Sequence, residues 1–320
     1  MNRIITTKSH NPRVAYGEAL LDLAAQNPKV VALDADLCKS TMSFLVEAKY
    51  PERFFEMGIA EQNMAATAAG LALGGKIPFI HSFAVFVCGR AYDQIRQAIC
   101  TARLNVKIVG SSAGLSDFGD GATHQSVEDV ALMRVLPRMT VLSPCDAFEV
   151  KKAVWAMAEL EGPVYLRLSR NDMPPLTQAE TPFEVGKIQQ MRAGTTLAIF
   201  ATGTMVAIAL EAARKLEELD LSAKVINVAT LKPLDEAGVR RESKGMQGVL
   251  TVEEHSVIGG LGSAVLEALA SSRIPVQRVG IQDKFGMSAM SHGELLEYFG
   301  LTPGRVVAAA QSLLRDGGAS

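Results

Sequence analysis

The chain has 320 residues, of which 48% are hydrophobic and 21% charged, and its formal net charge is −2. This length allows two domains with buried cores, and the near-neutral charge argues against a protein that binds nucleic acid through a basic face. No apolar run is long enough to span a membrane and the first residues lack the apolar stretch of a signal peptide, so we expect a cytoplasmic chain without membrane contact.

Short runs of β-branched and apolar residues alternate with helix-length segments in the first half of the chain. We expect strands at 29–36, 76–83, 106–112, 140–144 and 163–169, and helices at 60–73 and 146–160. Near-continuous apolar strands that alternate with helices indicate a mostly parallel sheet covered by helices on both faces.

Residues 170–187 break this rhythm with three prolines and scattered polar residues, which is typical of a linker. The alternation then restarts, with strands expected at 195–203, 222–229, 248–256 and 275–281, a helix at 205–219 and a second helix from Gly262. The sequence therefore predicts two α/β domains, one over residues 1–185 that includes the linker from about 170, and one over residues 186–320.

Two polar features interrupt the apolar pattern. Glu61 lies in the first turn of the alanine-rich helix at 60–73, where a carboxylate is favoured by the helix dipole. Asp120 and His124 lie in the glycine-flanked loop "FGDGATHQSVED". By residue type alone His124 fits a local hydrogen-bonding role about as well as a ligand contact. The four cysteines have no paired C-x-x-C spacing, so we expect free thiols and no metal site on this chain.

Several motifs, in a fixed order, resemble the transketolase family. The stretches "GIAEQNMAATAAGLAL", "SFAVFVCGRAYDQIRQA", "GLSDFGDGATHQSVEDVALMRVLP", "VLSPCD" and "PVYLRLSR" are similar to its pyrimidine-binding domain, and "LKPLD" and "TVEEHSVIGGLGSAV" to its C-terminal domain. The family also has an N-terminal domain, whose G-D-G…N motif holds Mg²⁺ and the diphosphate of thiamine diphosphate. That motif does not occur here, so the resemblance implies the second half of a split transketolase.

The resemblance implies an activity and a partner. A transketolase moves a two-carbon ketol unit from a ketose phosphate to an aldose phosphate, as in pentose phosphate metabolism. The expected cofactor is thiamine diphosphate, shared with an N-terminal-half partner chain that also holds Mg²⁺, and the expected assembly is α₂β₂ with sites between chains. The cofactor carries the chemistry, and the protein supplies binding, orientation and electrostatics.

The resemblance also assigns residues to the cofactor. Glu61 matches the catalytic glutamate that faces a ring nitrogen of the aminopyrimidine. Phe83 and Phe86 match the aromatic residues that stack on this ring, although as isolated residues they read as core phenylalanines. Asp36 matches an aspartate near the thiazolium.

Other positions match residues that contact the sugar substrate. His124 corresponds to a catalytic histidine that touches the substrate's hydroxyl and carbonyl oxygens, and Asp120 to an aspartate that binds a sugar hydroxyl. Arg13, Ser40 and Arg170 match residues that hold the substrate phosphate, a role that suits the forked guanidinium group.

Two departures and two alternatives accompany this assignment. Gly89 stands where the family has a third aromatic residue, and Ser112 stands where many members have a second substrate histidine.

The motifs also fit another enzyme of the same cofactor class, either a deoxyxylulose-phosphate-synthase-like chain or a 2-oxoacid-dehydrogenase β-like chain. A non-catalytic regulatory chain of the same fold is the second alternative, and intact Glu61, Asp120 and His124 count against it.

Overall fold

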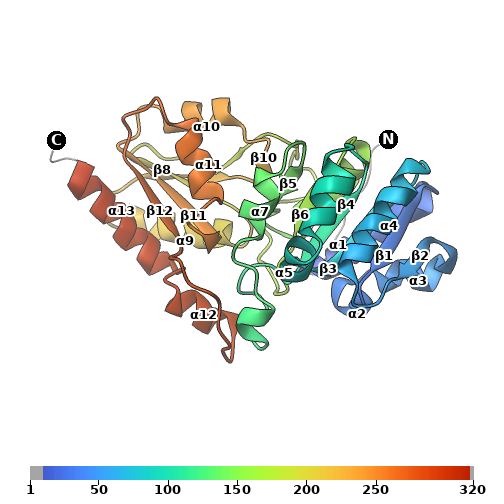
Figure 1. Ribbon diagram of the computed structural model, residues 1–320. Helices are drawn as coiled ribbons and strands as arrows, with labels where there is room; N and C mark the ends of the chain where they lie inside the picture. The colour runs from blue at the N-terminus through green and yellow to red at the C-terminus, as the bar shows by residue number, and fades with distance from the viewer. Residues whose placement is uncertain (1–9, 318–320) are drawn as a thin grey trace.

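The computed structural model describes residues 10–317, which form two sheets lying side by side (Figure 1). The first sheet has seven strands, in the spatial order β10 (Thr230–Lys232), β5 (Thr140–Leu142), β6 (Val164–Arg167), β4 (Lys107–Ser111), β3 (Ile77–Phe83), β1 (Val30–Asp34) and β2 (Phe54–Glu56). The second has five, in the order β12 (Val276–Ile281), β11 (Gly248–Ser256), β8 (Leu197–Ala201), β9 (Ala223–Asn227) and β7 (Gln189–Arg192).

Neighbouring strands are parallel within both sheets, except for the antiparallel edge pairs β10–β5 and β7–β9. The expected α/β fold with two mostly parallel sheets is confirmed. The sequence pattern missed the two antiparallel edge strands and β2, because strands of three or four residues carry too little periodicity to be recognised.

Helices cover both faces of the first sheet. On one face α1 (Pro12–Gln26) packs against α8 (Ala147–Glu159). The other face carries α4 (Glu61–Leu73), α5 (Ala84–Gly89), the π-helix η2 (Ile95–Cys100) and α7 (Asp129–Val135). The remaining short helices connect these layers: α2 (Cys38–Thr41), α3 (Phe44–Lys49), η1 (Pro51–Arg53), α6 (Tyr92–Gln94) and η3 (Gly121–Thr123).

The apolar strands are continuous in sequence because both of their faces are buried. In β1, Val31 and Leu33 enter one core cluster while Val30 and Ala32 enter the other. This follows from the alternation of side chains along a strand. The strands therefore lack the alternation of apolar and polar residues that marks a sheet with one solvated face, as the sequence predicted.

The second sheet is also covered on both faces. Four helices pack on it, with α9 (Met205–Glu217) and α13 (Pro303–Gly317) on one side and α10 (Glu236–Ser243) and α11 (Leu261–Ala268) on the other. The short helix α12 (His292–Tyr298) precedes α13. None of the helices within residues 10–317 has the length and apolar character needed to cross a bilayer.

The two halves of the chain are interlocked. Residues 168–188, which include the linker expected at 170–187, form no helix or strand. However, β10 comes from the second half of the chain and pairs with β5 of the first, and one core cluster contains both Ile108 of β4 and Phe200 of β8. The domain boundary near residue 185 stays a prediction.

Candidate active site

Glu61 is the first residue of α4 and its side chain is only 3% exposed. α4 packs closely on β3 and η2, and Ala65 and Ala68 in its buried face have side chains small enough to permit that approach. The carboxylate is therefore held at the end of a rigid helix rather than on a mobile surface turn. Its Oε1 lies 3.5 Å from the Ser82 hydroxyl in β3, which donates a long hydrogen bond to it.

Three ring side chains meet beside this carboxylate. Phe83 ends β3 and Phe86 lies one helical turn later in α5, and their rings are stacked with centroids 5.9 Å apart. The His124 ring, from the loop after β4, meets the Phe86 ring edge-on at 5.2 Å and the Phe83 ring at 6.2 Å. His124 Nδ1 is 2.9 Å from the Thr123 hydroxyl. The structure thus brings together Phe83, Phe86 and His124.

Arg90 connects the aromatic group to the carboxylate. Its Nη1 donates to Glu61 Oε1 over 2.8 Å, and its guanidinium carbon lies 4.1 Å from the centre of the Phe86 ring. The Arg90 side chain is 47% exposed, so a half-exposed cation covers a buried anion. Opposite charge and a cation–π contact both favour this position.

Glu61, Phe86, Arg90 and His124 line a pocket of about 370 Å³ together with Asp36, whereas Phe83 lies outside the lining. Its lining residues are Ala35, Asp36, Leu37, Ile59, Glu61, Phe86, Arg90, Thr123 and His124. Asp36 has a left-handed backbone with φ of 61°, and its main-chain N–H donates to Glu56 Oε1 over 2.8 Å. This backbone conformation is costly for a residue other than glycine. Asp36 is exposed and lies at the rim of the pocket.

The turn that carries Asp36 is fixed by the buried carboxylate of Asp34. Asp34 accepts hydrogen bonds from the hydroxyls of Thr41 at 2.7 Å and Ser43 at 2.8 Å, and from the main-chain N–H of Leu37. Burial raises the pKa of Asp34 to about 6, although these hydrogen bonds act in the opposite direction. The network makes residues 34–43 a single ordered unit.

The residues expected to bind phosphate form a second cluster. Arg13 donates to the main-chain carbonyl of Ser40 over 3.1 Å, and Arg170 pairs with Asp117 over 2.7 Å. Burial and the nearby positive charge of Arg170 lower the pKa of Arg13, so the two arginines are close enough to repel. Guanidinium groups bind anionic oxygens well, so two of them in one neighbourhood can hold an anion.

The cluster of Arg13, Ser40, Asp117 and Arg170 shares two chain segments with the pocket. Ser40 follows Asp36 in the same turn, and Asp117 begins the loop that ends in His124. Asp120, in the middle of that loop, is exposed and lies outside the lining of the pocket. The structure therefore places Asp120 at the surface between Asp117 and His124.

Two hydrogen bonds join this loop to other elements, and a third closes the loop on itself. The Leu115 N–H donates to Glu254 Oε1 over 2.7 Å, and Gln125 Nε2 donates to the carbonyls of Asp117 and Met287, each over 3.0 Å. Glu254 lies in β11 and Met287 in the segment before α12, so the second half of the chain positions the loop. Glycine-rich loops need such support to present a side chain reproducibly.

The two departures from the family pattern have different surroundings. A Cβ added at Gly89 would meet no atom within 4 Å, so this position borders open space. Ser112 is fully buried, with φ of 52°, and its hydroxyl has no hydrogen-bond partner among the described residues. Ser112 is therefore not part of the pocket's exposed lining.

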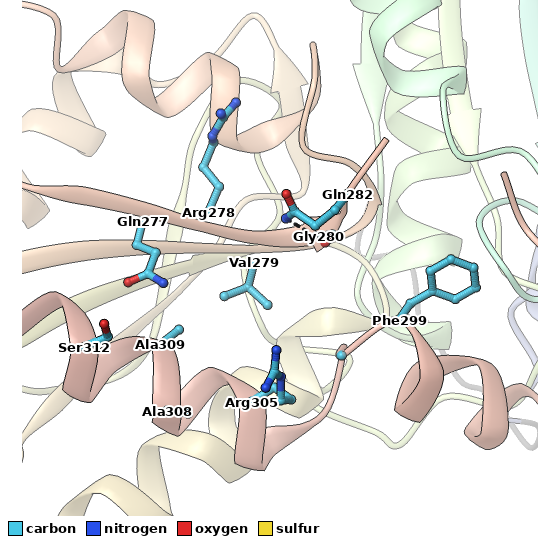
Figure 2. A pocket seen from close by; sticks show the side chains of 11 residues that line it. Gln277, Arg278, Val279, Gly280, Gln282, Phe299, Arg305, Ala308, Ala309 and Ser312 are labelled. Carbon is cyan, nitrogen blue, oxygen red and sulfur yellow. Dashed lines mark hydrogen bonds between the residues drawn. The ribbon is translucent and has the colours of Figure 1, made fainter. Parts of the chain in front are cut away.

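Other features of the molecule lie apart from these residues. A pocket of about 440 Å³ lies in the second half of the chain. Figure 2 shows Arg305 projecting from α13 toward Val279 of β12 beside it. Within residues 10–317 no group of three or more His, Cys, Asp or Glu side chains is arranged to hold a metal ion. The four cysteines are free thiols, as expected.

Comparison with known proteins defines the class of this molecule. Residues 8–175 match the model of the transketolase pyrimidine binding domain, and residues 186–306 match that of the transketolase C-terminal domain. The chain is 41% identical over 310 residues to the 6-deoxy-6-sulfo-D-fructose transketolase subunit SqwH of Clostridium sp. (strain MSTE9), covering 97% of this chain and 96% of that one.

A solved structure described as a split gene transketolase, inactive beta4 tetramer, is 47% identical with a TM-score of 0.86, covering 95% of this chain and 98% of that chain. A 1-deoxy-D-xylulose-5-phosphate synthase of Symbiobacterium thermophilum is 38% identical over 306 residues, which are 93% of this chain but 46% of that protein. The chain belongs to the transketolase family. It is similar to separately encoded subunits along its whole length, and to about half of the synthase.

The pocket's geometry fits the aminopyrimidine of thiamine diphosphate, the cofactor that the family match implies. The Arg90 guanidinium is a flat group bearing N–H donors, and it stacks on Phe86 while donating to Glu61. An aminopyrimidine is also flat and also carries N–H groups. The contacts of Arg90 show that one planar group can reach the Phe86 ring and the Glu61 carboxylate at once.

Sequence reasoning missed Arg90, Asp117 and Gln125. Arg90 follows Phe86 by four residues in a helical segment, and this spacing predicts contact between the two side chains. Asp117 and Gln125 gave no comparable signal, because their partners are distant in sequence. Only the folded chain brings Arg170 to Asp117 and Met287 to Gln125.

Proposed function

We propose that this chain is the C-terminal subunit of a split, thiamine-diphosphate-dependent transketolase. The observation that carries the proposal is the buried Glu61 carboxylate facing a pocket walled by Phe86 and His124, in a chain that belongs to the family. In this proposal the subunit transfers a two-carbon ketol unit from a ketose phosphate to an aldose phosphate.

Glu61 and the phenylalanines hold the aminopyrimidine in this proposal. The Phe86 ring presents a flat apolar face, and Phe83 supports it by stacking from behind. The Glu61 carboxyl group shares a proton with a ring nitrogen of the aminopyrimidine, as a general acid–base group does. When bound, thiamine diphosphate supplies the reactive thiazolium carbon and the electron sink. Asp36, at the rim, borders the thiazolium.

His124 and the arginine cluster act on the substrate. His124 lies on the pocket wall and donates to substrate oxygens whose charge changes during the reaction. Asp120 reaches a sugar hydroxyl from the exposed centre of the same loop. Arg13 and Arg170 bind the terminal phosphate, with Ser40 beside them. The sulfonate in the name of the Clostridium relative's substrate is also a terminal anion, and a two-arginine clamp accommodates either group.

A partner chain completes this site. In the proposal the N-terminal half carries the G-D-G…N motif that holds Mg²⁺ and the cofactor's diphosphate, and the assembly is α₂β₂. Apolar side chains stand exposed beside the His124 loop, with Phe285 82% and Met290 85% accessible. The hollow next to Met290, of about 660 Å³, is lined by Gly119 of that loop. Exposed apolar surface of this kind marks interaction sites, so we assign it to the same partner.

The synthase-like alternative is retained, because a deoxyxylulose-phosphate synthase is a relative over 93% of this chain. The two activities differ in their donor. A transketolase takes a ketose phosphate, whereas the synthase-like activity condenses a 2-oxoacid with an aldose phosphate. Arg13 and Arg170 serve either reaction, since both use a phosphorylated acceptor.

The test is reconstitution. The chain is purified alone, then mixed with the N-terminal-half chain, Mg²⁺ and thiamine diphosphate. The mixture is assayed with an aldose phosphate as acceptor and with a ketose phosphate, a sulfonated ketose or pyruvate as donor. We expect no turnover by either chain alone and ketol transfer from a ketose donor by the mixture. Condensation of pyruvate with the aldose phosphate, without transfer from the ketoses, would establish the synthase-like activity instead, and an inactive mixture that still forms a stable complex would support the regulatory alternative.

A further inference from the structure

The position of Arg90 follows from the local helix. α5 ends at Gly89, and the Arg90 N–H still donates to the Phe86 carbonyl over 2.8 Å. Residues four apart in a helical segment lie on one face, and long side chains point back toward the preceding turn. The Arg90 side chain is therefore directed over the Phe86 ring, with its guanidinium carbon 4.1 Å from the ring centre.

Arg90 covers both groups to which the proposed function assigns the cofactor ring. One contact is the face of Phe86, and the other is Oε1 of Glu61 at 2.8 Å. A ring that enters the pocket to stack on Phe86 and reach Glu61 has to take the place of the guanidinium. The two occupants are mutually exclusive on the same atoms.

The structure also indicates which member of the pair moves. Glu61 is 3% exposed and is fixed at the start of a close-packed helix, whereas the Arg90 side chain is 47% exposed. A half-exposed arginine is solvated again at little cost when it leaves such a pair. The neighbouring Gly89 has no side chain, and its Cβ direction is open, so space is present beside the arginine.

We propose that Arg90 is a displaceable plug that fills the aminopyrimidine slot of the free chain and leaves it when the cofactor ring enters. This inference rests on the proposed function, because it takes Glu61 and Phe86 as the ring's contacts. The plug keeps the apolar slot covered and the buried carboxylate paired until the site is assembled. It also lowers the affinity of the free chain for the ring, in proportion to the fraction of molecules that are open.

The test measures binding of thiamine to the isolated full-length chain by titration calorimetry. Thiamine lacks the diphosphate, so its affinity reports the pyrimidine slot without the partner's diphosphate site. The variants are Arg90→Ala and Arg90→Gln, and Arg96→Ala is the matched control because Arg96 is an exposed arginine outside the pocket lining. If about nine in ten molecules are plugged, Arg90→Ala binds thiamine about tenfold more tightly than the wild type.

We expect Arg90→Gln to bind several-fold more tightly, since it keeps a donor for Glu61 but loses the cation, and Arg96→Ala to match the wild type. Arg90→Gln also serves if Arg90→Ala fails to fold. Unchanged or weaker binding in a folded Arg90 variant overturns the plug. If Glu61→Ala removes thiamine binding in that case, the proposed slot stands and only the plug fails. Absence of binding by every variant at millimolar thiamine also overturns the plug, because removal of Arg90 then opens no slot, whereas the proposed function is tested separately by reconstitution with the partner chain.

Discussion

His292 Nε2 lies 2.9 Å from Glu254 Oε1, and this contact joins the start of α12 to β11 beneath the candidate site. The same Glu254 oxygen accepts the Leu115 N–H at the base of the His124 loop. The other Glu254 oxygen accepts from the Thr204 hydroxyl over 2.6 Å. The buried Glu254 carboxylate therefore connects the loop to Thr204 and His292, which both lie in the second half of the chain.

We expect His292→Leu to destabilise the protein by about 1.5–3 kcal/mol, because it leaves the buried carboxylate without a charged hydrogen-bond donor. His292→Gln is the control that keeps a donor without a charge. The measurement is urea unfolding followed by circular dichroism. A His292→Gln variant as stable as the wild type at pH 6 would mean that the charge contributes nothing, and equal losses for His292→Leu and His292→Gln would mean that the neutral donor contributes nothing.

The stability difference between the wild type and His292→Gln should depend on pH. Burial lowers the pKa of His292, but Glu254 outweighs burial and raises it above 6.5. Burial likewise raises the pKa of Glu254, but His292 and Arg167 outweigh it and lower that pKa to about 2. The contribution of His292 to stability is complete below pH 6.5 and is lost as pH rises through its raised pKa. The contribution of Glu254 is lost only as pH falls from 4.5 toward 2. Unfolding at pH 5.5 and pH 9 should give the larger difference at pH 5.5.

Glu61→Gln should leave the fold intact and slow exchange of the thiazolium proton in the reconstituted complex. An amide cannot share the proton with the ring nitrogen, and general acid–base groups typically contribute about 10²- to 10⁴-fold. Proton exchange into deuterated buffer, followed by NMR, measures the step directly. Near-native exchange by a folded Glu61→Gln complex would assign Glu61 a structural role.

Arg170→Ala should raise KM for phosphorylated donors more than it lowers kcat, because a phosphate clamp binds the ground and transition states alike. Hydroxypyruvate has no phosphate, so its kinetics should change little. Lys187→Ala, at a position away from the cluster, is a control for lost surface charge. Equal effects on both donors would show that Arg170 serves only to pair with Asp117.

His124→Ala should lower kcat for phosphorylated and unphosphorylated donors together. His124 is proposed to contact oxygens whose charge changes in the transition state, and loss of one such contact costs about 10²- to 10³-fold. Thr123→Val removes the neighbour at Nδ1 and should have a smaller effect in the same direction. Steady-state kinetics with both donors decides this, and an unaffected His124→Ala would make the loop structural.

The sequence predicted the long buried elements because these depend on local patterns. The roles of Glu61, Phe83, Phe86 and His124 came from the family resemblance and stay a prediction. The fully buried, mostly apolar runs of β1 and β3 define strands inside the sheet, and Phe86 follows Phe83 closely enough in sequence for their rings to stack. The pairing of β10 with β5 and the anchoring of Leu115 by Glu254 have no local signal. They depend on how two distant segments meet, which periodicity does not encode.

The pairing of β10 with β5 of the first sheet determines how the protein unfolds. If the two sheets were separate bodies on a flexible link, each would melt at its own temperature. Here neither can unfold without opening the β5 edge and the shared core around Ile108 and Phe200. Calorimetry should therefore record one cooperative transition, with a calorimetric enthalpy equal to the van't Hoff enthalpy. The chain behaves as one thermodynamic unit despite its two sheets.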